Sequence, residues 1–267
     1  MGQFLDAAGV LVILLGSSVL GLFIHPLLSE RHRSREAVEF VQLVVAMLTT
    51  FAALVLGLLT SSVKSSFDEV GNDIRTLSIQ LIQLDRSLRE WGPETQPARQ
   101  LLRAYTAAAI ATTWTGEPRP QGNFYPSEVP TRPGGSSLES PVMGDMLTRI
   151  ELDIRQLDPQ DPMHRRLETT CIAQFERLMH TRWKLVEEAG SSISVPFYVV
   201  LVFWLAIVFG SFGLTAPRNA LSYTVMMLAG LSIASAIFVI LELDTPFEGL
   251  FTVSSQPLRD ALTYLSQ

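Results

Sequence analysis

The chain of 267 residues is 48% hydrophobic and 17% charged, whereas soluble domains carry roughly 25% charged residues. Its apolar residues gather in four blocks, each long enough to cross the ~30 Å hydrocarbon core of a bilayer: 8–28, 40–63, 193–214 and 219–241. A formal net charge of −6 argues against the basic surface that nucleic-acid binding requires. The sequence therefore predicts an all-α, multispan membrane protein that lies in the lipid bilayer and has no nucleic-acid partner.

The order of the blocks divides the chain into three segments. We expect a transmembrane hairpin at 1–64, a soluble helical insert at 65–190, and a second transmembrane hairpin with a short C-terminal tail at 191–267. Arg31, Arg33 and Arg35 crowd the first short connection, which the positive-inside rule places in the cytoplasm. This charge count places the insert outside the cell. Basic residues also flank the spans on the other side, so the difference between the two counts is small.

The first span is not expected to be a cleaved signal peptide. No basic residue precedes it, and it lacks the small-residue exit of a cleavage site. It contains Gly16, Ser17, Ser18 and Gly21, a patch of small residues suited to contact with another helix.

The second span continues into the insert without a break in pattern. Beyond Lys64, apolar residues follow at alternating spacings of three and four, which is a heptad seam: Phe67, Val70, Ile74, Leu77, Leu81, Leu84, Leu88 and Trp91. Only Gly71 weakens it. We expect one helix, or two nearly collinear ones, leaving the membrane and burying this seam on a partner.

The second span also sorts its residues by size and polarity around the helix. On a projection at ~100° per residue, small and polar residues fall within an arc of roughly 120°: Gln42, Ala46, Thr49, Thr50, Ala53, Gly57, Thr60, Ser61 and Lys64. We call these nine residues the polar arc. Val44, Leu48, Phe51, Val55 and Leu58 occupy the opposite side. Two interpretations remain open: close helix packing through small residues, or the wall of an oligomeric pore.

The insert reads as helical throughout. After a turn at 91–93, helical patterns cover 98–114, 146–157 and 163–188, while the Pro- and Gly-rich segment 115–141 is expected to be an exposed loop. Together with the heptad helix, these elements are enough for a helical bundle. The single cysteine, Cys171, lies at helical spacing between apolar residues and is expected in the core.

Enzymatic chemistry finds no support in the sequence. Nucleophile, zinc, phosphate-loop and dinucleotide motifs are missing, so catalysis is not expected. One polar cluster stands out where the fourth span ends, with Glu242, Asp244 and Glu248 in seven residues. These carboxylates suggest a bound cation such as calcium, a contact between subunits or a pore mouth. The simpler alternative is a polar helix end stopped by Pro246.

Several segments resemble the bestrophin-like membrane proteins of bacteria. The match covers nearly the whole chain from the second span onward and rests on these segments: 84–86, 98–105, 196–197, 211–214, 216–220, 241–247 and 257–259. A more distant similarity to bestrophins proper rests on four spans and the run from Glu242 to Phe247.

The resemblance implies an oligomeric ion channel of the bacterial inner membrane. Bestrophins are pentameric anion channels with a cytoplasmic insert, a pore lined by the second span and, in some members, calcium bound at an acidic clasp. Inorganic ions and further copies of this chain are thus the implied partners, with anions favoured over cations. The second span lacks the stacked aromatics of bestrophins, because Phe51 is its only aromatic residue beyond Phe40. The alternative is a non-conducting membrane scaffold or sensor whose insert binds a partner.

Overall fold

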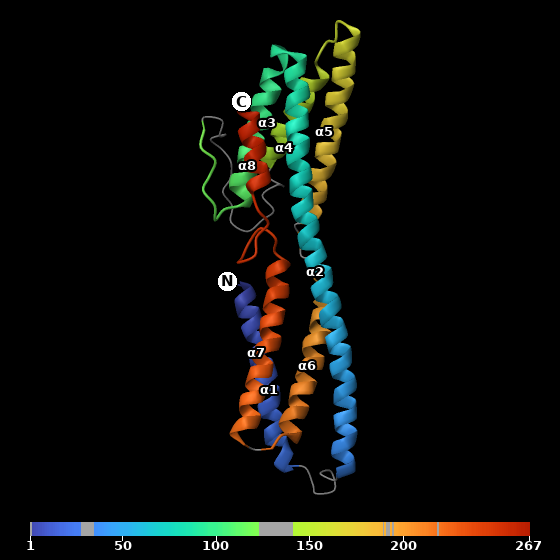
Figure 1. The fold of residues 1–267 in the computed structure, drawn as a ribbon, viewed down its shortest axis with the longest axis vertical. Coiled ribbons are helices and arrows are strands. Elements are labelled where there is room, and N and C mark those ends of the chain that lie inside the picture. Colours follow the sequence, from blue (N-terminus) through green and yellow to red (C-terminus); the bar gives the residue numbers. More distant parts are fainter. Residues whose placement is uncertain are drawn as a thin grey trace. The chain divides into compact units, whose positions relative to one another are not determined.

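The computed structural model describes residues 2–27, 35–122, 141–188, 190, 193, 195–217 and 219–267. Every regular element within these ranges is a helix, which confirms the all-α class. The α-helices are α1 (Gly2–Ile24), α2 (Arg35–Trp91), α3 (Gln96–Thr113), α4 (Pro141–Arg155), α5 (Pro162–Glu188), α6 (Val195–Thr215), α7 (Ala220–Leu243) and α8 (Gln256–Leu265) (Figure 1).

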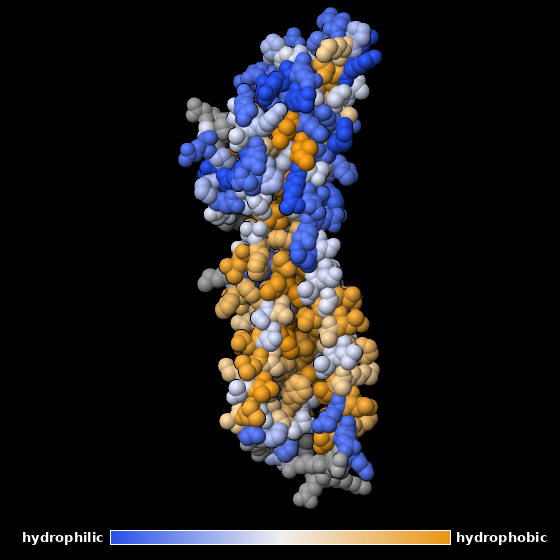
Figure 2. Space-filling model, in the orientation of Figure 1, coloured by the Kyte–Doolittle hydropathy of each residue, from blue (hydrophilic) through white to orange (hydrophobic). Residues whose placement is uncertain are grey.

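Contacts divide the chain into two compact units. The spanning unit comprises Met1–Ser66 and Ser192–Asp244, and the insert unit comprises Phe67–Ser191 and Thr245–Gln267. Within the described ranges, four helices are long and apolar enough to cross a membrane, namely α1, the apolar part of α2, α6 and α7. Apolar residues accordingly dominate the surface of α1, α6 and α7, whereas polar residues dominate the insert helices (Figure 2). The predicted four-span architecture is therefore confirmed.

The spanning unit is built around α1, which lies against both α6 and α7 (Figure 1). A Cβ atom added to Gly213 would collide with the carbonyl oxygen of Ser18, and one added to Gly21 would collide with the backbone of α6. The Ser18 hydroxyl donates to the Phe209 carbonyl over 3.0 Å. Ser18 and Gly21 thus make the helix contact predicted for the small-residue patch, because only small residues let two backbones approach this closely.

The insert unit has a core built on the heptad seam of α2. Val70, Ile74, Leu77, Leu81, Leu84 and Leu88 are all buried, and they share one cluster with side chains of α3, α4, α5 and α8. The partner that the seam required is therefore supplied by the same chain. Cys171 lies in this cluster, where burial raises the pKa of its thiol to about 11.

The C-terminal tail also belongs to the insert. Helix α8 buries Leu258, Ala261, Leu262 and Leu265, and the Trp114 indole at the end of α3 donates to the Val253 carbonyl over 2.6 Å. Of the expected loop at 115–141, residues 123–140 lie outside the described residues.

Candidate functional site

All nine residues of the polar arc lie on the outside of the single chain. Gln42, Ala46, Thr49, Thr50, Ala53, Gly57, Thr60, Ser61 and Lys64 are each exposed. A Cβ added to Gly57 would meet no atom of this chain within 4 Å. Within the described part of the chain, the arc is therefore not buried by other helices, and water, lipid or another copy of the protein can reach it.

Two further faces complete the spanning part of α2. A packing face includes the buried Ala52 and Val63, and the half-buried Val41, Val45 and Leu48 lie on the same side of the helix. A third face, apolar and exposed, includes Leu54 and Leu58. The side opposite the arc therefore belongs partly to the packing face and partly to the exposed surface. Leu48 and Val55 are half-buried, whereas Val44 and Phe51 are exposed.

The packing face is small compared with those of the other spans. Only 6% of the apolar window of α2 is buried within the chain, against 28% for each of the other three spans. The Phe51 ring lies 6.3 Å from the ring of Trp204 on α6. Helix α2 is therefore the span that the protomer covers least.

The hydroxyl groups of the arc donate to their own helix. Thr49, Thr50 and Thr60 donate to the carbonyls of Val45, Ala46 and Leu56 over 2.7, 2.9 and 2.7 Å. Each hydroxyl oxygen keeps lone pairs that can accept a hydrogen bond from water or from a partner. These three threonines thus present acceptors at the surface of the arc while their own hydroxyl donors are satisfied.

A groove adjoins the first part of the arc. It has a volume of about 430 Å³ and is lined by Val41, Gln42, Val45, Ala46 and Thr49 of α2 and by Ser211, Phe212 and Thr215 of α6. Gln42, Ala46 and Thr49 therefore belong to the polar arc and also line this groove.

The three residues of the predicted acidic cluster, Glu242, Asp244 and Glu248, differ in their surroundings. Glu242 is buried near the end of α7, and an Asp244 carboxylate oxygen accepts from the Ile193 amide over 3.1 Å, while Glu248 is an exposed residue of the insert unit. Asp244 thereby links the end of α7 to the segment that precedes α6.

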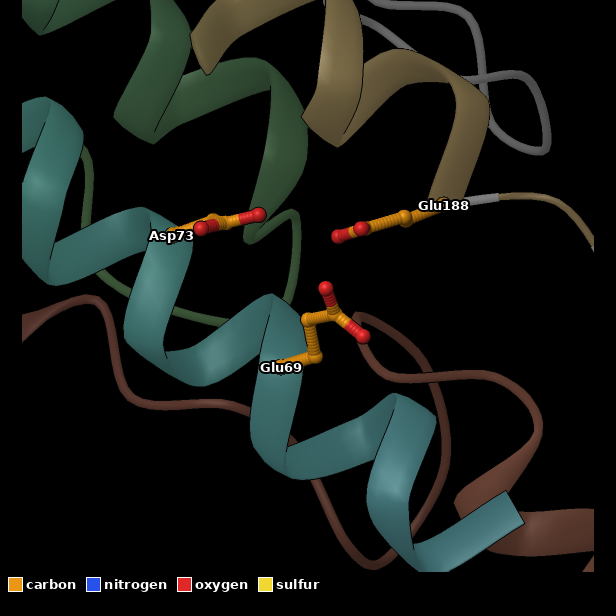
Figure 3. A group of neighbouring side chains, drawn as sticks. All are labelled: Glu69, Asp73 and Glu188. Atoms are coloured by element: carbon orange, nitrogen blue, oxygen red, sulfur yellow. The ribbon is translucent and has the colours of Figure 1, made fainter. Parts of the chain in front are cut away.

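A different acidic group lies in the insert. Among the described residues, Glu69, Asp73 and Glu188 place carboxylate oxygens within 4.8 Å of one another, and Figure 3 shows Glu188 of α5 pointing toward the two α2 residues. The Lys184 Nζ atom lies 2.6, 3.0 and 3.2 Å from the carboxylates of Glu69, Asp73 and Glu188. An ammonium group is therefore the cation that ties these acidic side chains of α2 and α5 together.

This ion-pair group has perturbed titration behaviour. The hydrogen bond from Lys184 lowers the pKa of Glu69, and hydrogen bonds to Glu69 and Asp73 raise the pKa of Lys184. Burial raises the pKa of Glu188, and the charge of Asp73 adds to that effect. The sequence held a partial signal, because Glu69 and Asp73, like Lys184 and Glu188, are four residues apart on one helix. It could not show that the two pairs meet.

A second ion-pair group explains two residues that carried the family resemblance. Asp85 is fully buried on α2, and its two oxygens accept from Arg99 of α3 and Arg89 of α2, each over 2.8 Å. A buried carboxylate must be paired, so Asp85 and Arg99 fix α3 against α2.

The comparisons with known proteins agree with this architecture. The model of the bestrophin-like domain family matches residues 11–258. A crystal structure of a point variant of a bacterial bestrophin homologue from Klebsiella pneumoniae is 14% identical, with a TM-score of 0.67, and covers 98% of this chain and 100% of that one. The homologue solved by zinc anomalous phasing is 17% identical, with a TM-score of 0.64, and covers 96% of this chain and 98% of that one.

No functionally curated protein matches the chain. The structural likeness, at such low identity, supports the fold, while the family match extends from the first span to α8. The chain therefore belongs to the bestrophin-like family.

Proposed function

We propose that the protein is an oligomeric ion channel whose pore is lined by the polar arc of α2, and that it prefers anions to cations. The observation that carries this proposal is the exposure of all nine arc residues beside a packing face that is occupied. Hydrocarbon gains nothing from a column of hydroxyls, an amide and an ammonium, whereas water solvates all of them. Membership of the bestrophin-like family supports a channel-like role.

A single arc cannot enclose a water-filled path, so the channel requires several copies of α2 around an axis. Bestrophins are pentamers, and we infer the same symmetry here. Lys64, at the end of the arc, would then repeat as a ring of positive charge. Such rings raise the local concentration of anions at a channel mouth.

Cysteine accessibility tests the lining. In a Cys171→Ser background, we expect cysteines at Thr49, Ala53, Gly57 and Thr60 to react with small charged thiol reagents and to change the current through reconstituted protein. Cysteines at Phe51, Val55 and Leu58 are expected to stay unreactive. Leu58 is the closest control, because it is exposed in the single chain like the arc residues but lies on the apolar face.

A charge series at Lys64 tests the ion preference. Under a salt gradient, Lys64→Gln should shift the reversal potential toward cations, and Lys64→Glu should shift it further, because the ring loses one and then two charges per subunit. A potential that is the same in all three proteins would contradict anion selection by this ring. Unreactive arc cysteines together with no current would instead favour a membrane scaffold or sensor.

We infer that Glu242 and Asp244 hold the end of the fourth span and do not form a calcium site with Glu248. The Asp244 bond to the Ile193 amide supports this role. Glu242→Gln with Asp244→Asn should lower the thermal stability of the purified protein. A loss of calcium response at unchanged stability would restore the calcium interpretation.

We also infer a location in the bacterial inner membrane with the insert in the cytoplasm. The charge count pointed the other way by a narrow margin, and the family match now favours the arrangement of bestrophins.

A further inference from the structure

The segment that joins α7 to α8 presents two large apolar side chains at the tip of a fixed turn. Leu250 is 77% exposed, the highest value among the large hydrophobic residues of the described chain, and Phe251 is 46% exposed. Both lie in the insert unit, whose face seen in Figure 2 is mainly polar. An exposed apolar pair on a fixed turn indicates a surface that is covered by something.

The base of the turn is held firmly. The Val253 amide donates to the Pro246 carbonyl over 2.8 Å and so closes a loop around the tip. The Phe247 ring packs edge-on against Trp114, with ring centroids 5.5 Å apart, and the Val253 side chain is buried. Leu250 and Phe251 are therefore held outward by a packed base and do not belong to a fraying end.

The tip conformation depends on a glycine. Gly249 has φ of 97°, in the left-handed region that residues with a Cβ rarely adopt. This residue lies directly before Leu250, inside the loop that the Val253–Pro246 hydrogen bond closes. The sequence thus specifies a turn that projects the two apolar residues.

The turn follows directly after a membrane span in the chain, which indicates the membrane as its cover. Helix α7 crosses the membrane and ends at Leu243, and the closed loop begins three residues later at Pro246. Seven residues separate Leu243 from Leu250, and even a fully extended chain of that length spans only roughly 25 Å, so the membrane interface is within reach of Leu250. The interfacial layer on each side of the hydrocarbon is roughly 5–7 Å thick. Leucine and phenylalanine gain free energy when their apolar surface leaves water for this layer.

We propose that the 245–254 turn is a membrane-interface anchor, with Leu250 and Phe251 inserted among the lipid headgroups and upper acyl chains. The anchor adds an attachment of the insert unit to the bilayer beside the covalent links to α2, α6 and α7. It is independent of whether the protein conducts ions.

Spin labels on single cysteines test this in the full-length protein, reconstituted into vesicles of phosphatidylethanolamine and phosphatidylglycerol. Labels at Leu250→Cys and Phe251→Cys, in a Cys171→Ser background, should collide with lipid-soluble oxygen several-fold more than with a water-soluble nickel chelate. Gln160→Cys on the exposed surface of the insert gives the aqueous reference, and Leu231→Cys on α7 gives the membrane reference.

The three outcomes are distinct. Preference for oxygen supports the anchor. Ready collision with the nickel chelate means that the tip lies in water, and weak collision with both reagents means that protein, such as a second copy, covers it; either result overturns the proposal. A label at Leu250 in a Phe251→Asp background should lose most of its oxygen preference, because a carboxylate disfavours insertion.

Discussion

The buried carboxylate of Asp85 shows how one residue can fix two helices. Its oxygens are shared by Arg99 and Arg89, whose side chains are 13% and 41% exposed, while its own side chain is fully buried. Removing one partner of a buried pair leaves an uncompensated charge, which is costly even when the pair itself contributes little.

We expect Asp85→Asn to destabilise the insert by about 3–5 kcal/mol, as measured by denaturant unfolding followed through tryptophan fluorescence. The neighbouring pair between Arg86 and Glu90 has 72% and 49% exposed side chains, so Arg86→Gln is a matched control. An exposed pair four residues apart contributes only about 0.3–0.5 kcal/mol. Equal effects of the two substitutions would show that burial of Asp85 does not matter.

His164 carries a pH dependence. Its Nδ1 lies 2.6 Å from Asp161, and its Nε2 lies 3.3 Å from the Trp91 carbonyl. Only an imidazolium donates to both acceptors. The hydrogen bond to Asp161 raises the pKa of His164, and hydrogen bonds from His164 lower the pKa of Asp161.

A histidine whose pKa is raised by folding stabilises the native state below its unfolded pKa of about 6.5, and that stabilisation is lost as pH rises through the folded pKa. We therefore expect His164→Gln to lower the melting temperature at pH 6 and to have a smaller effect at pH 9. His180→Gln, at an exposed site on the same helix, is the control. A deficit of the same size at both pH values would exclude the imidazolium.

At the scale of elements, two glycines distinguish a helix face that packs within the chain from one that does not. A Cβ on Gly213 would strike the backbone of α1, whereas one on Gly57 would meet no atom of the same chain. The contact at Gly213 therefore lies within one protomer, whereas Gly57 faces the surroundings of the protomer.

Gly213→Ala should therefore destabilise the protomer by at least the roughly 1–3 kcal/mol of an overpacked core. Gly57→Ala should leave its thermal stability in detergent unchanged. Size-exclusion profiles recorded during heating would measure both. A stable Gly213→Ala protein would mean that α1 and α6 separate more easily than their close approach indicates.

At the scale of the whole molecule, cysteine labelling reports the side of the membrane on which the insert lies. Gln160 is exposed in the insert, so a cysteine there, in a Cys171→Ser background, reports its side. We expect a membrane-impermeant maleimide to label Gln160→Cys after lysis and not in intact cells. Labelling of intact cells would place the insert outside, as the count of basic residues predicted.

Much of the fold followed from the sequence, because spans and heptads are periodic patterns along one helix. The apolar run and the seam from Phe67 to Trp91 predicted α2, and the structure joins them in a single helix of 57 residues. Helix α8 was not predicted, because a short amphipathic segment after the last span gives little signal by itself.

The sequence by itself determined the four spans, the helical insert and the polar arc, since each depends on residues spaced along one helix. The tertiary structure decided which faces are covered. It filled the heptad seam from within the chain, left the arc exposed, and brought Lys184 to Glu69, Asp73 and Glu188. Lys184 lies more than a hundred positions beyond Glu69 and Asp73, and local periodicity holds no information about pairs so distant in the chain.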